Sequence, residues 1–310
     1  MRRVTDIALV TGAHGSIGRN VAVTLAHQGW TVHGIGHGGW GAEERRSWGI
    51  ESWTESDISL AELRSLDIRP DIIVHCAGSG SVGASISDPH QDFHRTVSAT
   101  ACVLEFMRSE CPQATLVYPS SAAVYGIAEH FPIREDAALR PASPYGAHKR
   151  QAEDLVRDHA RLFNLNAAVV RLFSIYGEGF RKQLLWDACR RICADETEFF
   201  GTGLETRDWL HVSDAAKLMI RAADHAGPHC PVANGGFGVA VTVADIVGEL
   251  FDLMGKNDRP VFCGTERQGD PRDYQADISR AMAWGWRPSV DWRAGLSRYA
   301  TWFRKECGLE

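Results

Sequence analysis

The glycine-rich segment Thr11–Gly18 constrains the fold of this 310-residue chain more than any other stretch. It follows the apolar run Ile7–Val10, which has the length and composition of a buried strand. Apolar residues at helical spacing, Val21 and Leu25, come directly after it. The sequence therefore predicts a strand, a tight glycine turn and a helix in immediate succession.

The spacing of the three glycines in this turn is typical of dinucleotide-binding sites. Gly12 allows a tight turn, Gly15 lets the backbone approach a pyrophosphate, and Gly18 lets the helix pack closely on the strand. The unpaired amides and the positive dipole end of the helix then face the phosphates. The residues predicted to contact a dinucleotide here are Gly12, His14, Gly15, Ser16, Ile17 and Gly18.

Further strand-like runs alternate with helical patterns along the chain. They cover residues 31–35, 71–75, 115–119 and 167–172, and long helices are predicted over 91–110 and 145–163. Alternation of this kind is typical of an α/β fold with a parallel, doubly wound, Rossmann-type sheet that has helices on both faces. Ligands bind such sheets at the carboxyl ends of the strands.

Composition limits the kinds of molecule that this chain can bind and the surroundings in which it works. With 44% hydrophobic residues the chain can bury a large core, and a formal net charge of −6 argues against a nucleic-acid partner. We find no secretion signal and no apolar stretch long enough for a membrane span. The eight cysteines have neither disulfide-like nor zinc-like spacing. We therefore expect a cytoplasmic protein without a metal site.

Tyr145 and Lys149 lie four residues apart, so a helix places both on one face. A free phenol has a pKa of about 10 and is a poor base at neutral pH. A nearby ammonium favours the phenolate, so we expect Lys149 to lower the pKa of Tyr145. Such a pair is suited to moving a proton to or from a sugar hydroxyl while a hydride is transferred.

The end of the second strand bears on the choice of cofactor. NAD-binding sheets usually carry an acidic residue there for the ribose hydroxyls, whereas this chain has Gly36 and His37. Gly36 leaves room for a 2′-phosphate, and His37, Arg45 or Arg46 could pair with it. This pattern favours NADP over NAD.

Taken together, these features resemble the extended short-chain dehydrogenase/reductase family, and within it the nucleotide-sugar epimerase/dehydratase branch. The resemblance runs from Val10 to Pro288. It implies that Ser121, Tyr145 and Lys149 are catalytic, and that Tyr145 and Lys149 also contact the cofactor. It implies further cofactor contacts from Asp57, Ile58, Cys76, Ala77 and Gly78.

The resemblance also implies a substrate site for a nucleotide-diphosphate sugar. Its predicted residues are Ser121, Ser174, Arg207, Arg267 and Asp270, with Ser174 standing where the family usually has asparagine. Guanidinium groups suit a diphosphate because their planar fork pairs with its oxygens. By the family's pattern, residues 1–175 and 208–240 form the dinucleotide-binding domain and 176–207 and 241–310 a smaller C-terminal α/β substrate domain. Four tryptophans, Trp284, Trp286, Trp292 and Trp302, are expected to pack that smaller domain. Relatives pair their long helices across a dimer axis, so we expect a homodimer.

Missing residues separate the reactions within this branch. The 4,6-dehydratases of the family carry an Asp–Glu pair where Ala122 and Ala123 stand, and GDP-fucose-forming enzymes carry a cysteine at the place of Ala123. Alanine has no proton to move, so both reactions are disfavoured. We favour a 4-epimerase acting at C4 of a nucleotide-activated hexose. The alternative is an NADPH-dependent 4-keto-sugar nucleotide reductase. A non-catalytic dinucleotide sensor is disfavoured because Ser121, Tyr145 and Lys149 are all present.

Overall fold

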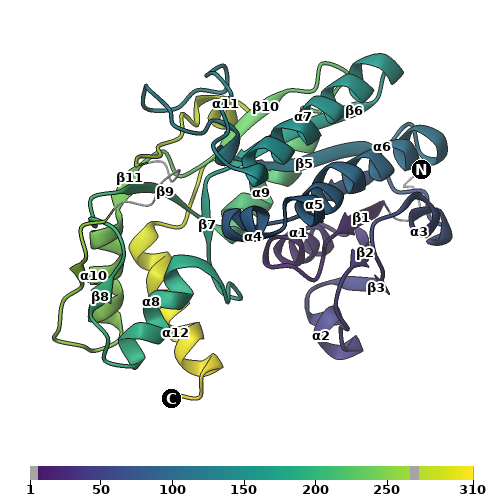
Figure 1. Cartoon of the computed structure of the whole chain (residues 1–310). Helices are drawn as coiled ribbons and strands as arrows, with labels where there is room; N and C mark the ends of the chain where they lie inside the picture. Colours follow the sequence, from purple (N-terminus) through teal and green to yellow (C-terminus); the bar gives the residue numbers. More distant parts are fainter. Residues whose placement is uncertain (1–5, 266–271, 310) are drawn as a thin grey trace.

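The chain forms a seven-stranded parallel sheet with helices on both faces (Figure 1). The structure, a computed structural model, describes residues 6–265 and 272–309. The strand order is β10-β6-β5-β4-β1-β2-β3. The bounds are β1 (Ile7–Thr11), β2 (Thr31–Gly36), β3 (Ile50–Glu55), β4 (Ile72–His75), β5 (Thr115–Ser121), β6 (Asn166–Leu172) and β10 (Val232–Gly235). The predicted Rossmann-type α/β fold is confirmed.

Helices cover the two faces of this sheet because their apolar sides meet the strands' buried residues. On one face lie α1 (Ser16–His27) and α9 (Val212–Ala223), and on the other α3 (Leu60–Ser65), α6 (Ala99–Glu110) and α7 (Pro144–Phe163). The short α2 (Ala42–Ser47) follows β2, and α4 (Val82–Ser87) follows β4. The predicted helix over 91–110 is divided in three: α5 (Pro89–Phe93), a π-helical turn His94–Ser98, and α6.

A second hydrophobic core lies among the two smaller sheets and three further helices. A three-stranded sheet joins β7 (Ser174–Tyr176), β9 (Thr206–His211) and β11 (Ala240–Thr242), and a two-stranded sheet joins β8 (Glu198–Phe199) and β12 (Val261–Phe262). The helices are α8 (Gln183–Cys193), α10 (Val243–Leu253) and α12 (Trp292–Glu306). The short α11 (Ser279–Ala283) packs Ala281 into the core of the seven-stranded sheet instead. The predicted division of the chain into two domains at residues 175, 207 and 240 stays a prediction. The strands β7 and β9, at the two ends of the segment 176–207, pair with each other.

The C-terminal tryptophans divide between the two cores. Trp292 and Trp302 pack in the smaller core, as predicted. The prediction was wrong for Trp284 and Trp286, which pack against the core formed by β1, α1 and α9. The physical reason is a specific anchor: Trp286 Nε1 donates to the carbonyl of Asp214 on α9, at 3.1 Å.

A buried ion pair fixes α7 to the sheet. Arg171 on β6 is 2% exposed and donates to Glu153 on α7 through Nε at 3.0 Å and Nη2 at 2.8 Å. Arg157 adds a third cationic contact to the same carboxylate at 2.6 Å. Charges buried this deeply are tolerated only when they are paired and hydrogen bonded. The pair therefore determines how α7, which carries Tyr145 and Lys149, sits on β6.

None of the helices built from residues 6–265 and 272–309 combines the length and the apolar character that crossing a membrane requires.

Candidate active site

Ser121 and Tyr145 come together where β5 ends and α7 begins. Ser143 caps α7, its Oγ accepting from the Gly146 amide at 3.2 Å, and Pro144 suits the first helical position. A Cβ on Gly146 would lie 2.5 Å from the Ala123 carbonyl oxygen, so only glycine lets α7 approach this closely. As a result the Ser121 hydroxyl comes within reach of the Tyr145 phenol, where it favours the phenolate.

Lys149 lies one turn further along α7 and is buried, with 6% of its surface exposed. Its Nζ donates to the Pro119 carbonyl at 3.0 Å and lies 4.9 Å from the centre of the Tyr118 ring. Burial lowers the pKa of this ammonium to about 8. A Cβ on Gly78 would lie 3.8 Å from Nζ, so the segment after β4 reaches Lys149.

The expected lowering of the Tyr145 pKa by Lys149 is not what the structure shows. The pKa of Tyr145 is raised, first because burial disfavours the phenolate, and also because of the nearby Asp92 carboxylate. The hydrogen bond from Ser121 acts in the opposite direction. In this state the phenol is a proton donor, and Ser121 is the group that eases its ionisation.

The glycine turn fits the phosphates of a dinucleotide. Gly12 has φ +66° and a Cβ there would lie 2.6 Å from the Ala77 amide nitrogen. A Cβ on Gly18 would lie 2.3 Å from the Gly12 carbonyl oxygen. No side chain of the described residues caps α1, since its N-cap is Gly15, so the first amides of the helix are left without a side-chain acceptor and suit an anion. Ser16 Oγ donates to the Gly179 carbonyl at 3.1 Å, tying this turn to the loop after β7.

Two polar residues that the sequence did not single out hold the segment after β4 in place. Thr11 Oγ1 accepts from the Ala77 amide at 3.1 Å and lies 2.7 Å from His75 Nδ1. Burial, and next the Lys149 charge, lower the pKa of His75 to about 3, so this imidazole is neutral. Burial also raises the pKa of the Cys76 thiol to about 12. Cys76, Ala77 and Gly78 thus form an uncharged wall beside Lys149. A threonine immediately before the first glycine is the one sequence signal that could have pointed to this network.

Directly after β2, the tertiary structure brings in a carboxylate where the local sequence has none. His37 Nε2 lies 2.9 Å from Asp57 Oδ1, and both side chains are exposed. Ile58 packs against the core under this pair. The His14 ring packs against Trp40, with 4.8 Å between ring centres. Arg45 and Arg46 lie on α2 and ion-pair with none of the described carboxylates. The tertiary structure therefore brings a carboxylate to the residue predicted to bind a 2′-phosphate.

The substrate-side predictions are only partly covered by the structure. Arg207, on β9, donates through Nη1 to the carbonyls of Thr206 at 2.8 Å and Arg272 at 3.2 Å. Its guanidinium lies 5.8 Å from the centre of the Tyr274 ring. Ser174 is half-buried at the start of β7. Arg267 and Asp270 lie outside the described residues.

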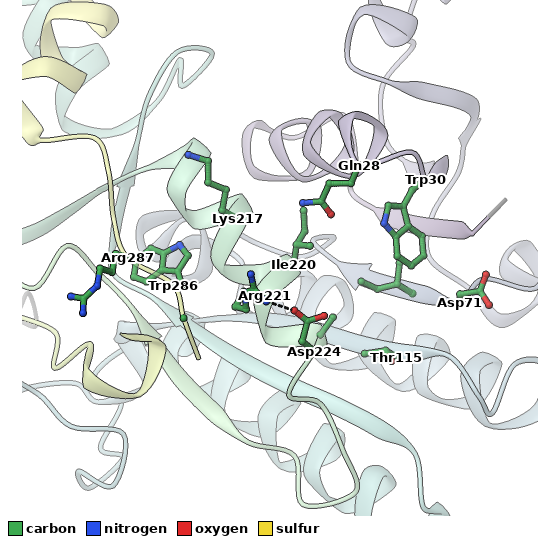
Figure 2. Close-up of a pocket in the computed structure, with 13 residues that line it drawn as sticks. Gln28, Trp30, Asp71, Thr115, Lys217, Ile220, Arg221, Asp224, Trp286 and Arg287 are labelled. Atoms are coloured by element: carbon green, nitrogen blue, oxygen red, sulfur yellow. Dashed lines mark hydrogen bonds and ion pairs between the residues drawn. The ribbon is translucent and has the colours of Figure 1, made fainter. Parts of the chain in front are cut away.

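A cavity of about 570 Å³ lies at the amino ends of β4 and β5, whereas Ser121 lies at the carboxyl end of β5. Figure 2 shows Trp30, Lys217 and Trp286 around it, with Arg221 ion-paired to Asp224. Thr115, the first residue of β5, lines this cavity, whereas Ser121, predicted to be catalytic, is the last residue of β5. None of the described residues predicted to bind cofactor or substrate lines it.

Known proteins resemble this chain in both fold and sequence. Residues 8–234 match the model of the NAD dependent epimerase/dehydratase family. The UDP-glucose 4-epimerase of Azospirillum brasilense is 31% identical over 321 residues, covering 96% of this chain and 91% of that protein. The UDP-glucose 4-epimerase of Thermotoga maritima, solved with UDP-glucose, has a TM-score of 0.89 and 26% identity, covering 97% of this chain and 99% of that one. MoeE5, solved with UDP-glucuronic acid and NAD, has a TM-score of 0.86 and 28% identity over the same shares.

The family model spans most of the chain, and the glycine turn, Ser121, Tyr145 and Lys149 all fall inside the matched residues. The predicted enzyme class is thereby confirmed. The protein belongs to the NAD dependent epimerase/dehydratase family and is an enzyme of the extended short-chain dehydrogenase/reductase type.

Proposed function

We propose that this enzyme is a UDP-sugar 4-epimerase. The proposal rests on Ser121 next to Tyr145 and the buried Lys149, with Ala122 and Ala123 directly after Ser121. The pair can move a proton at a sugar hydroxyl, while the two alanines offer no group for eliminating water. The relatives named above that act on UDP-glucose, and the UDP-sugar in each of the two solved relatives, support UDP as the nucleotide.

The residues divide the chemistry at C4 of the sugar. A bound nicotinamide dinucleotide, held by the turn Gly12–Gly18, supplies the acceptor and donor of hydride. In its ionised form Tyr145 Oη takes the proton from the C4 hydroxyl in the oxidation, and it returns that proton in the reduction. Ser121 hydrogen bonds to the C4 oxygen of the sugar and stabilises the negative charge that develops on that oxygen. Lys149 provides a fixed positive charge on the cofactor side of Tyr145.

The direct test offers the purified enzyme UDP-glucose, UDP-galactose and UDP-glucuronate separately, and follows the C4 configuration by NMR. An epimerase interconverts at least one pair without net consumption of added cofactor. A reductase would instead oxidise NADPH stoichiometrically with a 4-keto sugar nucleotide and would leave all three UDP-sugars unchanged. That second result would overturn the proposal.

The NADP preference inferred from Gly36 and His37 remains a prediction, and the Asp57 carboxylate beside His37 opposes it. A carboxylate near a 2′-phosphate costs binding energy through repulsion. We expect Asp57→Asn to strengthen NADPH binding several-fold relative to NADH, and His37→Ala to weaken it. Dissociation constants of both cofactors for wild type and the two variants decide the point. Tighter NADH than NADPH binding by the wild-type enzyme would reject the NADP preference and leave NAD as the cofactor.

Replacement of Arg207 by alanine should weaken binding of UDP-sugar and leave the cofactor almost unaffected. A guanidinium that pairs with a diphosphate forms charge-assisted hydrogen bonds, each contributing about 1.5–3 kcal/mol. We therefore expect the dissociation constant for UDP to rise roughly 10–100-fold. Calorimetric titration with UDP and with NADH measures both effects. Arg293→Ala, which removes an exposed arginine stacked on Trp292, is the matched control. Equal loss of NADH binding in Arg207→Ala would mean that Arg207 does not lie at the substrate diphosphate.

We also propose that the enzyme is a homodimer that pairs α6 and α7 with their copies. The two helices lie side by side on one face of the sheet, and α7 ends in exposed Leu162 and Phe163. Light scattering should give about twice the chain mass of 34.1 kDa. A monomer mass for wild type would reject this assembly.

A further inference from the structure

A carboxylate that neither the sequence nor the family match singled out lies beneath the catalytic helix. Asp92, on α5, is 3% exposed. Its Oδ2 accepts a short hydrogen bond from His148 Nδ1, and His148 stands on α7 between Tyr145 and Lys149. Among the described residues no group hydrogen bonds to the other oxygen, Oδ1, although it is buried. The pair thus joins α5 to the first turns of α7.

The buried Lys149 ammonium needs a compensating negative charge, because an isolated buried cation is costly. Its hydrogen-bond acceptor, the Pro119 carbonyl, is neutral. Three groups that can carry a negative charge act to raise the Lys149 pKa: the Cys76 thiol, Asp92 and Glu153. The helix α5, which carries Asp92, packs directly against α7. Two of the three groups are unavailable. The Cys76 pKa of about 12 keeps that thiol protonated. Glu153 is already committed to Arg171 and Arg157.

This elimination leaves Asp92 as the compensating charge. We propose that Asp92 and His148 are positioning residues of the active site, in which His148 orients the Asp92 carboxylate and Asp92 balances the Lys149 ammonium beside Tyr145. The catalytic meaning of this pair rests on the proposed function, whereas its effect on Lys149 does not.

The surroundings allow a selective test. The elements packed around the pair carry further titratable or charged groups. On α7 these are Tyr145, Lys149, Arg150, Glu153, Asp154, Arg157, Asp158, His159 and Arg161. The others are Tyr118 on β5, His75 and Cys76 at the end of β4, His90 on α5, and His94 and Arg95 in the π-helical turn. α4 contributes none. His90 and His94 are exposed and face each other, with 3.1 Å between their Nε2 atoms. The Phe93 ring contacts His148, with 5.5 Å between ring centres.

The experiment follows the titration of Lys149 itself by NMR of lysine labelled with ¹³C at Cε. The chain's other lysines, Lys182, Lys217, Lys256 and Lys305, give reference signals, and Lys149→Met assigns the signal of interest. In wild type we expect a midpoint near the Lys149 pKa of about 8. In Asp92→Asn, which keeps an acceptor oxygen for His148, the midpoint should fall by roughly one pH unit. Asp92→Glu, which retains the charge, should restore much of the shift.

Controls separate charge from structure. Asp154→Asn neutralises an exposed carboxylate of the same helix, which pairs with Arg157, and should leave the Lys149 midpoint unchanged. If Asp92→Asn does not fold, the double variant Asp92→Asn/His148→Gln carries the same expectation, because a neutral amide pair can retain the hydrogen bond without the buried charge. An unchanged Lys149 midpoint in a folded charge-neutral variant would overturn the proposal.

The kinetic arm connects this pair to catalysis. For a UDP-sugar that the wild type epimerises, the alkaline limb of kcat/KM should move to lower pH in Asp92→Asn by about the NMR shift. A shifted limb supports the positioning role, and an unshifted limb alongside a shifted Lys149 signal rejects it. If the wild type epimerises no UDP-sugar, the proposed function fails while the NMR result still decides whether Asp92 balances Lys149.

Discussion

Replacement of Tyr145 by phenylalanine should lower kcat for epimerisation by about 10² or more, the usual scale of general acid–base catalysis. The variant keeps the ring and its packing in the first turn of α7 but removes the phenolic proton, whose release Ser121 favours. Cofactor binding should remain, because the glycine turn and Lys149 are unchanged. Stopped assays with UDP-glucose, together with a titration of NADH, measure the two effects separately.

A matched variant shows whether this loss is chemical. Tyr299→Phe removes a buried phenol in the smaller core, where it donates to the Phe180 carbonyl at 2.7 Å, and should change kcat little. Ser121→Ala should give a smaller loss than Tyr145→Phe, since Ser121 assists the proton transfer but does not carry the proton. Near-normal turnover by Tyr145→Phe would mean that another group moves the proton and that Tyr145 is not the acid–base residue.

Replacement of Glu153 by alanine should lower the free energy of unfolding by about 3–5 kcal/mol, because it leaves the buried Arg171 guanidinium without its carboxylate. The hydrogen bonds of Arg171 to the Tyr125 hydroxyl and the Glu135 carbonyl, at 3.0 and 2.9 Å, do not neutralise the charge. Urea unfolding followed by circular dichroism measures the loss. Since α7 rests on this pair, turnover should fall as well.

The exposed ion pair Asp158–Arg161 on the same helix is the control. Asp158→Ala should change stability by less than about 1 kcal/mol, as is usual for exposed pairs. The double variant Glu153→Leu/Arg171→Leu should be less destabilised than Glu153→Ala, because it buries no unpaired charge. If Glu153→Ala were no more destabilising than Asp158→Ala, the pair would not be what holds α7 on β6.

Much of the site was accessible from local sequence because its signals are local. The strand–glycine–helix order predicted the cofactor turn, and the four-residue spacing placed Tyr145 and Lys149 on one helix. Four of the five strands predicted for this sheet contain an uninterrupted run of at least three apolar residues. β3 and β10 were missed because Ile50–Glu55 is mixed in polarity and Val232–Gly235 has only two apolar residues before Asn234 and Gly235.

Ion pairs between distant segments could not be predicted in the same way. Nothing in the pattern after β2 indicates that His37 meets Asp57, which lies beyond β3, or that Asp92 meets His148. The helix predicted over 91–110 contains a π-helical turn that periodicity alone does not reveal. Such contacts depend on how the layers pack, which a local pattern does not contain.

The sequence by itself determined the strand–glycine–helix order at the start of the chain and predicted the acid–base pair, because backbone preferences and residue spacing act over a few residues. Only the tertiary structure decided the electrostatics of the site. Burial raises the pKa of Tyr145 and lowers that of Lys149 to about 8. These shifts depend on how much water the packed layers exclude and on which charges they bring near, and both are properties of the folded chain.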